Sequence, residues 1–392
     1  MHPQRKNEQH IAVFGQTGSG KTVLVSSFYG AAQEREVTKN ELFDIVADST
    51  SQGGQLHENY LGMRNSSKLP GTTRFASTSY SFSLKLKKGP AAKQKRKKPE
   101  DVLRLVWHDY PGEWFEEDIS EPEEAQRRVD TFRSLLSSDV ALLLVDGQRL
   151  VDNAGEEQRY LKALLTQFRN ELRKLKDQLL DGGKPLVTFP RIWIMALSKS
   201  DLLPDMSVTS FMELLIEKAR PEIDALREVL GELIEEKEAL SVGEDFVLLS
   251  SAKFDANKIE VTKRVGMNLF LPIAAVLPLE RHLRWAKRLS NGGKVGEKLL
   301  QGAGLLAEAL GGVGAIAGVL AGRSNKVLGA IAFVLSNFGA QLSDAAKMGG
   351  DKLHESHTEA LAKHEYLKAI LTGFQMDLEK SEEEQILLRS RR

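Results

Sequence analysis

The sequence has no cysteine and no net charge, and each absence excludes a class of function. Without cysteine, the 392-residue chain forms no disulfide, no thiolate metal site and no cysteine nucleophile, and a reducing cell interior is its natural environment. Lys and Arg number 54, as do Asp and Glu, so the overall charge gives no argument for nucleic-acid binding, and we expect none. The polar N-terminus, MHPQRKNEQH, does not read as a secretory signal. We expect a cytoplasmic protein.

Short apolar runs separated by helical stretches predict an α/β fold with a doubly wound, mostly parallel sheet. Serine-rich residues 77–86 alternate apolar side chains on one face, which predicts a strand antiparallel to 103–108. A heptad-like leucine stripe predicts a long amphipathic helix over 161–179, and a second helix is expected over 211–240, with Gly243 marking its end. The five apolar runs are His10–Phe14, Leu103–His108, Val140–Asp146, Arg191–Leu197 and Phe246–Ser250.

The composition changes near residue 290, and we expect two parts. Residues 7–290 would form the α/β domain, and residues 291–392 a helical region. Within the helical region, residues 299–345 are glycine-rich and apolar and predict a helical hairpin. The charged tail after residue 350 carries a helical apolar face with Leu367, Ile370, Leu371, Phe374 and Leu378.

The first run is followed by a complete phosphate-binding pattern, G-x-x-x-x-G-K-[ST]. Gly15, Gly18, Ser19 and Gly20 belong to the loop, and a helix-compatible run follows. Glycines let the backbone wrap closely around phosphate oxygens and present its N–H groups to negative charge. Lys21 would reach the β- and γ-phosphates, and the Thr22 hydroxyl would bind Mg²⁺. Strand, loop and helix in this order predict a nucleotide site, without specifying the base.

Three further elements predict that the base is guanine. Asp109 and Gly112 directly follow the second run in a D-x-x-G element. Asp109 would hold Mg²⁺, and the Gly112 N–H would donate to the γ-phosphate. Lys199 and Asp201 follow the fourth run in a [NT]-K-x-D-like element with Ser198 in place of asparagine or threonine. The Asp201 carboxylate accepts from guanine N1–H and N2, which adenine cannot offer. The last element is Ser251-Ala252-Lys253, whose Ala252 N–H would face guanine O6.

With these elements in order, residues 7–290 resemble the translation-factor-related (TRAFAC) class of P-loop GTPases. The string from Asp109 to Trp114, DYPGEW, is similar to the corresponding segment of the YcjX-like bacterial predicted GTPases. Pro70-Gly71-Thr72-Thr73-Arg74 resembles the switch I element of Era- and TrmE-like members, which assigns Mg²⁺ binding to Thr73, with Thr72 as the alternate. The chain between Lys21 and Thr73 is longer than in a minimal Ras-like protein. The resemblance implies a Mg²⁺-dependent GTPase that binds GTP and GDP and acts as a molecular switch.

The sequence predicts slow hydrolysis. Lys21, Thr73 and Gly112 would stabilise charge on the transferred phosphoryl group. Glu113 stands where Ras has a water-orienting glutamine, and the phosphate repels a carboxylate there, so we favour a structural role for Glu113 over a general base. A partner, a second protomer or Arg74 would then have to supply a positive group. A non-hydrolysing GTP-binding scaffold is the alternative, and an ATPase is disfavoured by Asp201.

The output of the switch is expected in the C-terminal region. Gly314, Gly318 and Gly322 lie on one helical face, a spacing that lets helices approach closely. Two readings stay open for 299–345: a buried hairpin, or insertion or docking at the inner face of a membrane. We expect a protein partner or self-association through these helices.

Overall fold

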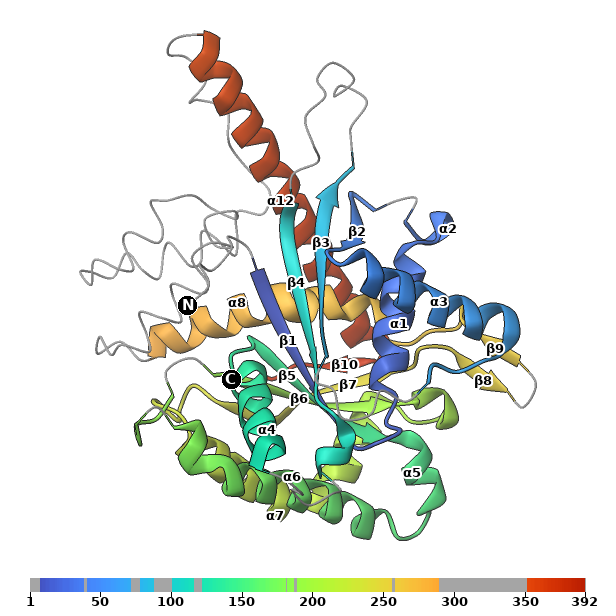
Figure 1. Ribbon diagram of the computed structural model, residues 1–392, viewed down its shortest axis with the longest axis vertical. Coiled ribbons are helices and arrows are strands. Elements are labelled where there is room, and N and C mark those ends of the chain that lie inside the picture. Colours follow the sequence, from blue (N-terminus) through green and yellow to red (C-terminus); the bar gives the residue numbers. More distant parts are fainter. Residues whose placement is uncertain are drawn as a thin grey trace.

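An eight-stranded mixed sheet forms the centre of the protein (Figure 1). The computed structural model describes residues 8–38, 41–71, 78–87, 101–115, 122–180, 182–186, 189–255, 258–288 and 351–391. Across the sheet the strands lie in the order β10-β7-β6-β5-β1-β4-β3-β2. The five central strands are mutually parallel, while β3, and β10 at the far edge, run antiparallel to their neighbours. The predicted α/β class is therefore confirmed.

The apolar runs become the central strands because they are buried on both faces of the sheet. The predicted antiparallel pairing of 77–86 with 103–108 is also confirmed, as β3 and β4 pair along their length. Sequence patterns missed the edge strand β2, which pairs with β3. The bounds are β1 Glu8–Phe14, β2 Phe43–Ala47, β3 Thr78–Leu86, β4 Asp101–Asp109, β5 Val140–Asp146, β6 Ile192–Ser198 and β7 Ser241–Leu249.

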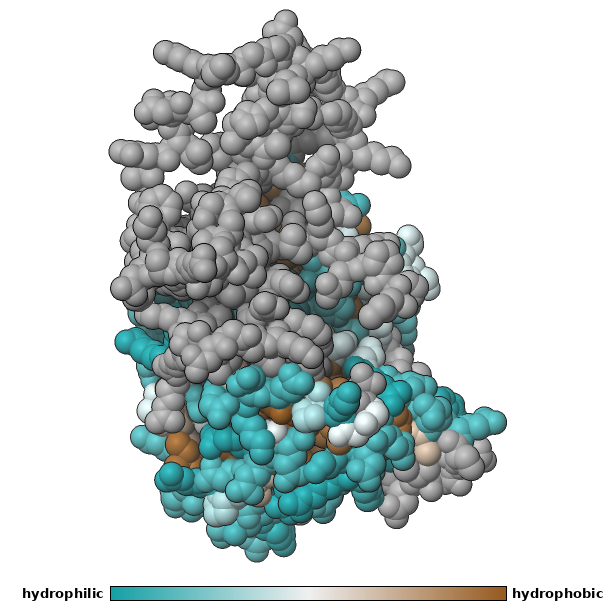
Figure 2. Space-filling view, turned by 90° about the vertical axis from the view of Figure 1, so that its left-hand side faces the viewer, coloured by the Kyte–Doolittle hydropathy of each residue, from teal (hydrophilic) through white to brown (hydrophobic). Residues whose placement is uncertain are grey.

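Four helices cover one face of the sheet and run along the lower part of Figure 1. They are α4 (Pro122–Leu135), α5 (Gly147–Asp152), α6 (Glu157–Leu179) and α7 (Val208–Glu232). The predicted stripe on α6 is confirmed, since all seven of its apolar residues are buried against the sheet. On the face shown in Figure 2, the described surface in the lower part of the molecule is mainly hydrophilic.

The prediction of a helix up to Leu240 was wrong. Helix α7 ends at Glu232, and residues 241–249 form β7. Gly243 lies inside that strand with φ 68°, beside a register shift between β6 and β7, and a Cβ there would lie 2.5 Å from Ile223. Glycine is thus required by a bulge in a strand rather than by a helix end. Inside α7, a kink at Ala219 precedes Pro221.

The other face carries α1 (Lys21–Ala32), α3 (Thr50–Ser66), α8 (Phe270–Arg288) and α12 (Asp351–Glu383). Helix α8 crosses behind the central strands in Figure 1, and α12 packs against it. The five apolar residues predicted for the tail helix are buried in the same core as β1 and β4. Shorter elements are α2 Arg35–Thr38, η2 Gly112–Phe115, η3 Ser200–Leu202, η4 Met267–Leu269 and the hairpin β8 Lys253–Asp255 with β9 Lys258–Glu260.

The chain's last residues add a strand that the charged composition did not predict. β10 (Leu387–Leu388) pairs with β7, and the buried ion pair of Arg281 and Asp245, 2.7 Å apart, lies beside it. The Ser390 N–H donates to Asp245 over 2.8 Å, and Arg281 donates to the Ser390 carbonyl over 3.0 Å. The described tail is therefore part of the core of the α/β domain.

The glycine-rich stretch 299–345 lies outside the described residues. Within the part of the chain that the structure describes, no helix is both long and apolar enough to cross a bilayer.

Candidate functional site

Five loops open at one edge of the sheet, at the carboxyl ends of the parallel strands. Val13 pairs with Asp109, so β1 and β4 end together, and Ser198 pairs with both Asp146 and Leu249, so β5, β6 and β7 end together, three residues beyond the end of β1. β1 lies between β4 and β5, where the order of strands reverses. In α/β sheets, ligands bind in the crevice outside such a point. The predicted site residues of the described chain come from these loops.

The loop after β1 is held by its own lysine. Gly18 and Gly20 adopt φ of 79° and 92°, a left-handed region that L side chains rarely enter. The Lys21 ammonium donates to the carbonyls of Gly15 over 2.8 Å and Gln16 over 3.2 Å, and its side chain is buried. Gly20 precedes α1 and leaves the first N–H groups of the helix without a side-chain cap. The loop thus combines a cation with the positive end of a helix.

Unsatisfied polar atoms gather around this loop. Thr17 Oγ1, Ser19 Oγ and Asp109 Oδ1 are buried and have no hydrogen-bond partner among the described residues. Such atoms are uncommon because each one costs about 1 to 3 kcal/mol when it is left unpaired. Oxygen donors of this kind suit Mg²⁺ and its water ligands. The residues present therefore fit a phosphate group with a divalent cation.

Asp109 and Gly112 are brought against the loop by β4. Burial raises the pKa of Asp109 to about 6, the Lys21 ammonium lowers it and the Glu113 carboxylate raises it further. A Cβ on Gly112 would lie 2.4 Å from the Thr17 nitrogen and 2.6 Å from the Gln16 carbonyl carbon. Only glycine permits this close approach between the two elements. Glu113, partly exposed, is near enough to act on Asp109 electrostatically.

The segment around Gly112 is fixed to the helices beneath it. Tyr110 and Trp114 are buried, with their rings 5.3 Å apart, and Tyr110 packs on Phe132 of α4. Arg128 donates to the Trp114 carbonyl over 3.0 Å, and its guanidinium lies 5.6 Å from the centre of the Trp114 ring. Arg128 is 1% exposed and pairs with Glu124, so it is anchored in the core.

The two elements expected to read the base are joined. Ser250 Oγ donates to Asp201 Oδ1 over 2.7 Å, and the Phe254 N–H donates to Oδ2 over 3.2 Å. Ala252 is fully buried beside them. The Ser251 carbonyl accepts a 2.9 Å bond from Ser27 of α1, which ties this loop to the helix of the phosphate loop. The Asp201 carboxylate is therefore held in one orientation, while Lys253 is exposed.

Lys199 is positioned by a carboxylate that sequence reasoning did not single out. Its ammonium lies 2.8 Å from Asp146 Oδ2 at the end of β5, and Asp146 Oδ1 accepts from the Gln148 N–H over 2.9 Å. Lys199 has φ 54°, which costs a residue with a side chain about 1 to 2 kcal/mol. A Cβ on Gly147 would lie 2.7 Å from the Ser198 carbonyl oxygen, so the two loops are in direct contact.

Thr72, Thr73 and Arg74 lie outside the described residues, so the expectations for switch I stand as made. Thr22 is the second residue of α1 and is partly buried.

The family of the chain follows from a match to a family model. The model of a family described as Double-GTPase 2 matches residues 9–242, more than half of the chain. The chain belongs to the Double-GTPase 2 family. No curated protein gives a significant match. The matched range includes the phosphate loop, Asp109 and Asp201, and ends before Ser251.

This Double-GTPase 2 protein also matches solved structures at low identity. The GDP-bound RocCORdC part of Methanosarcina barkeri Roco2 is 13% identical over 65% of this chain and 48% of that chain, with a TM-score of 0.22. Sup35 with GDP is 12% identical over 63% and 38%, with a TM-score of 0.24. The conserved domain of a dynein light intermediate chain is 10% identical over 63% and 69%, with a TM-score of 0.21. The chain thus spans half or less of the first two proteins.

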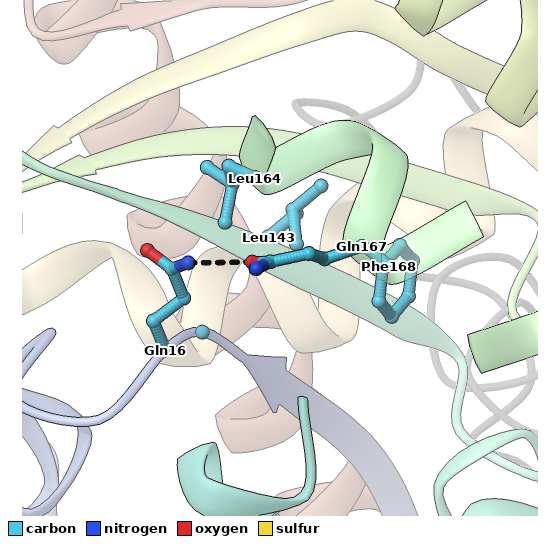
Figure 3. A pocket seen from close by; sticks show the side chains of 6 residues that line it. Gln16, Leu143, Leu164, Gln167 and Phe168 are labelled. Carbon is cyan, nitrogen blue, oxygen red and sulfur yellow. Dashed lines mark hydrogen bonds between the residues drawn. The ribbon is translucent and has the colours of Figure 1, made fainter. Parts of the chain in front are cut away.

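The Double-GTPase 2 domain fixes its phosphate loop through a glutamine pair. Gln16 Nε2 donates to Gln167 Oε1 of α6 over 2.8 Å, in a small cavity lined by Leu143, Leu164 and Phe168 (Figure 3). Ser198, which replaces the usual asparagine or threonine, instead donates to the Val145 carbonyl over 3.3 Å. The Gln16–Gln167 bond therefore ties the phosphate loop to α6.

The sequence did not predict the roles of three residues that position others at the site: Asp146, Gln167 and Ser250. Asp146 carried a usable signal, because it is the polar last residue of a buried parallel strand and precedes a glycine. Gln167 carried none, since it lies among exposed polar positions of an amphipathic helix.

Proposed function

We propose that this Double-GTPase 2 protein is a GTP-binding molecular switch that hydrolyses GTP slowly to GDP and phosphate. One observation carries the proposal. The Asp201 carboxylate, held by Ser250 and the Phe254 N–H, lies at the same sheet edge as Lys21 and Asp109. A fixed carboxylate pairs with guanine N1–H and N2 and is left unpaired by adenine, a difference that can reach about 10⁴ in affinity or rate.

The phosphate end is assigned to the loop after β1. Lys21 would leave its loop carbonyls for the β- and γ-phosphates, and the N–H of Gly112 would donate to the γ-phosphate. Thr22, Asp109 and Thr73 would hold Mg²⁺, which neutralises charge on the β- and γ-oxygens when bound. Lys199 would lie along the base, and the backbone N–H of Ala252 would donate to guanine O6.

Slow hydrolysis follows from Glu113. The Glu113 carboxylate already acts on Asp109 electrostatically. Beside the γ-phosphate, this negative charge would be repelled by the phosphate and would not orient the attacking water. Arg128 is 1% exposed and donates to the Trp114 carbonyl, so we do not assign it to the phosphates. A positive group from a partner, a second protomer or Arg74 would then raise the rate by about 10³ to 10⁵.

Nucleotide state would reach the C-terminal region through β7. The Leu248 N–H donates to the Ile386 carbonyl over 2.9 Å, two residues before Ser250. A shift of the guanine loop would therefore be passed to β10 through this pairing. We expect the readout, through a protein partner, self-association or a membrane surface, on the C-terminal helices of a cytoplasmic protein.

Titration calorimetry with GTP, GDP and ATP in the presence of Mg²⁺ tests nucleotide binding. GTP and GDP should bind at least about 100-fold more tightly than ATP. Lys21→Ala should abolish binding, whereas Lys176→Ala, which removes a partly exposed lysine on α6, should leave it unchanged. Equal affinity for ATP and GTP would refute the proposal.

Phosphate release distinguishes the switch from the alternative, a GTP-binding scaffold that does not hydrolyse. The Glu113 position favours this alternative, because it lacks a group that orients water. Steady-state release well below one per second, abolished by Lys21→Ala, supports the slow GTPase. Release at several per second without a partner contradicts slow turnover, and no release above the Lys21→Ala background supports the scaffold.

A further inference from the structure

A second cavity lies at the opposite end of α1 from the nucleotide site. It has a volume of about 290 Å³ and opens between α1, β2, η4 and the tail helix α12. Lys21 begins α1, whereas the cavity is lined by Ala31 and Ala32 in the last turn. At about 1.5 Å per residue, the two sites are about 15 Å apart along the helix. The cavity is therefore separate from the residues assigned to GTP.

The floor of this cavity, which we term the α1–α12 groove, is apolar. Phe28, Phe43, Met267, Leu271 and Phe374 line it from five different elements. Each of these side chains is at most 7% exposed, and the rings of Phe43 and Phe374 lie edge to face at 5.8 Å. The volume is near the lower end of those that bind small molecules, and an apolar body would gain by displacing water from this floor.

One rim of the groove carries two carboxylates, Glu41 before β2 and Asp377 on α12. Neither forms an ion pair within 4 Å in the part of the chain that the structure describes. Burial raises the pKa of Glu41, which Asp377 raises further and Lys87 lowers. Burial also raises the pKa of Asp377, and Lys380 lowers it. Both carboxylates line the same cavity beside its apolar floor, so a cation bound there would be attracted by both.

The groove's own arginine does not occupy that place. Arg264 lines the same cavity, but its charge acts on Tyr60 and Glu34 and on neither rim carboxylate. A second positive charge on a ligand would meet Arg264, so a ligand with one cationic end fits better than a diamine. We propose that the α1–α12 groove binds a small, soluble, singly charged amphipathic amine, with its ammonium between Glu41 and Asp377 and its apolar chain on the phenylalanine floor.

Binding in the groove has a route to the nucleotide loops. Helix α1 continues from the phosphate loop, and Ser250 pairs with Val265, one residue from the groove-lining Arg264, through two 2.9 Å backbone bonds. A ligand would thus contact two segments that continue into the GTP site. We expect it to change the rate of GDP release.

Octylamine is a suitable probe, with octanol and octanoate as probes of equal chain length. By calorimetry on the nucleotide-free full chain, octylamine should bind about tenfold more tightly than octanol, and octanoate should be weakest. Equal affinity for all three, or no binding of octylamine, would overturn the proposal.

Variants test the position of the ammonium. The double variant Glu41→Gln/Asp377→Asn should bind octylamine no better than octanol, while Asp44→Asn, at a carboxylate of β2 that does not line the groove, should bind it as the wild type does. Undiminished preference for the amine in the double variant would refute the assignment. Thermal denaturation checks that both variants fold. Octylamine binding by a protein that fails to bind guanine nucleotides would refute the proposed GTPase function alone.

Discussion

Asp146 and Lys199 join the ends of neighbouring strands through an ion pair of 2.8 Å. Asp146 is 3% exposed, and its second oxygen caps the N-terminus of α5. The lysine expected along the guanine base is therefore oriented by a buried carboxylate of β5 rather than by solvent.

Asp146→Asn removes the charge and keeps an oxygen able to cap α5. Lys199 then loses its charged partner, so we predict that GDP affinity falls about tenfold while the melting temperature changes little. Calorimetry measures this, with Asp152→Asn on the exposed end of α5 as the control. Affinity within twofold of the wild type would contradict a positioning role for Asp146.

The Gln16–Gln167 bond offers a second test of how the phosphate loop is braced. Gln167→Leu leaves the amide of Gln16 without its partner in an apolar cavity, and we predict a three- to tenfold loss of GDP affinity, about 1 kcal/mol. A double-mutant cycle with Gln16→Leu isolates the pair. Additive effects of the two substitutions would mean that the bond does not hold the loop.

Arg281 and Asp245 are both fully buried, which makes the C-terminal tail sensitive to a single charge. Arg281→Met leaves the carboxylate without its cation, and we predict a loss of about 3 to 5 kcal/mol in the free energy of unfolding. Urea denaturation measures this, and Arg220→Met in an exposed ion pair of α7 is the control. Equal midpoints for the two variants would show that the tail is not anchored through this pair.

Asp139 gives the protein a defined pH dependence. Burial raises its pKa to about 6, opposed by the His10 N–H bond of 2.6 Å. The folded state holds this proton more tightly than the unfolded state, whose pKa is near 3.8, so the stabilisation is complete below 3.8 and is lost as pH rises through 6. Asp139→Asn stays neutral and keeps an acceptor. We predict equal stability near pH 3.5 and a gain of up to about 3 kcal/mol for the variant above pH 6. A constant difference across pH 3.5 to 7.5 would contradict this cause.

The sequence predicted those parts of the fold that depend on burial along one segment. Central strands are apolar on both faces, so β5 was located to the residue, and α6 carries a stripe that only a helix produces. Edge strand β2 was missed because it is five residues long, with alternate positions exposed. β10 was missed because its short apolar pair follows a charged helix, and only pairing with β7 makes it a strand.

The site was predictable where a backbone shape or charge is fixed by local sequence. Gly18, Gly20 and Lys21 are close in the chain, and the geometry of the loop follows from them. Partners that come from distant elements were not predictable, because Gln167 and Asp146 acquire their roles only when α6 and β5 pack beside the loops. Ser198 shows the same limit, because its hydroxyl donates to the Val145 carbonyl, an acceptor that comes from the neighbouring strand β5.

The central claim is that Asp201 selects guanine, and a change of base specificity tests it most directly. Xanthine carries a carbonyl at C2 where guanine carries an amine, so an amide at position 201 would donate where the carboxylate accepts. Calorimetry of the wild type and Asp201→Asn with GDP and xanthosine diphosphate measures the exchange. We predict that the variant loses GDP affinity by about 100-fold or more and gains affinity for xanthosine diphosphate. Unchanged GDP affinity in Asp201→Asn would contradict the claim.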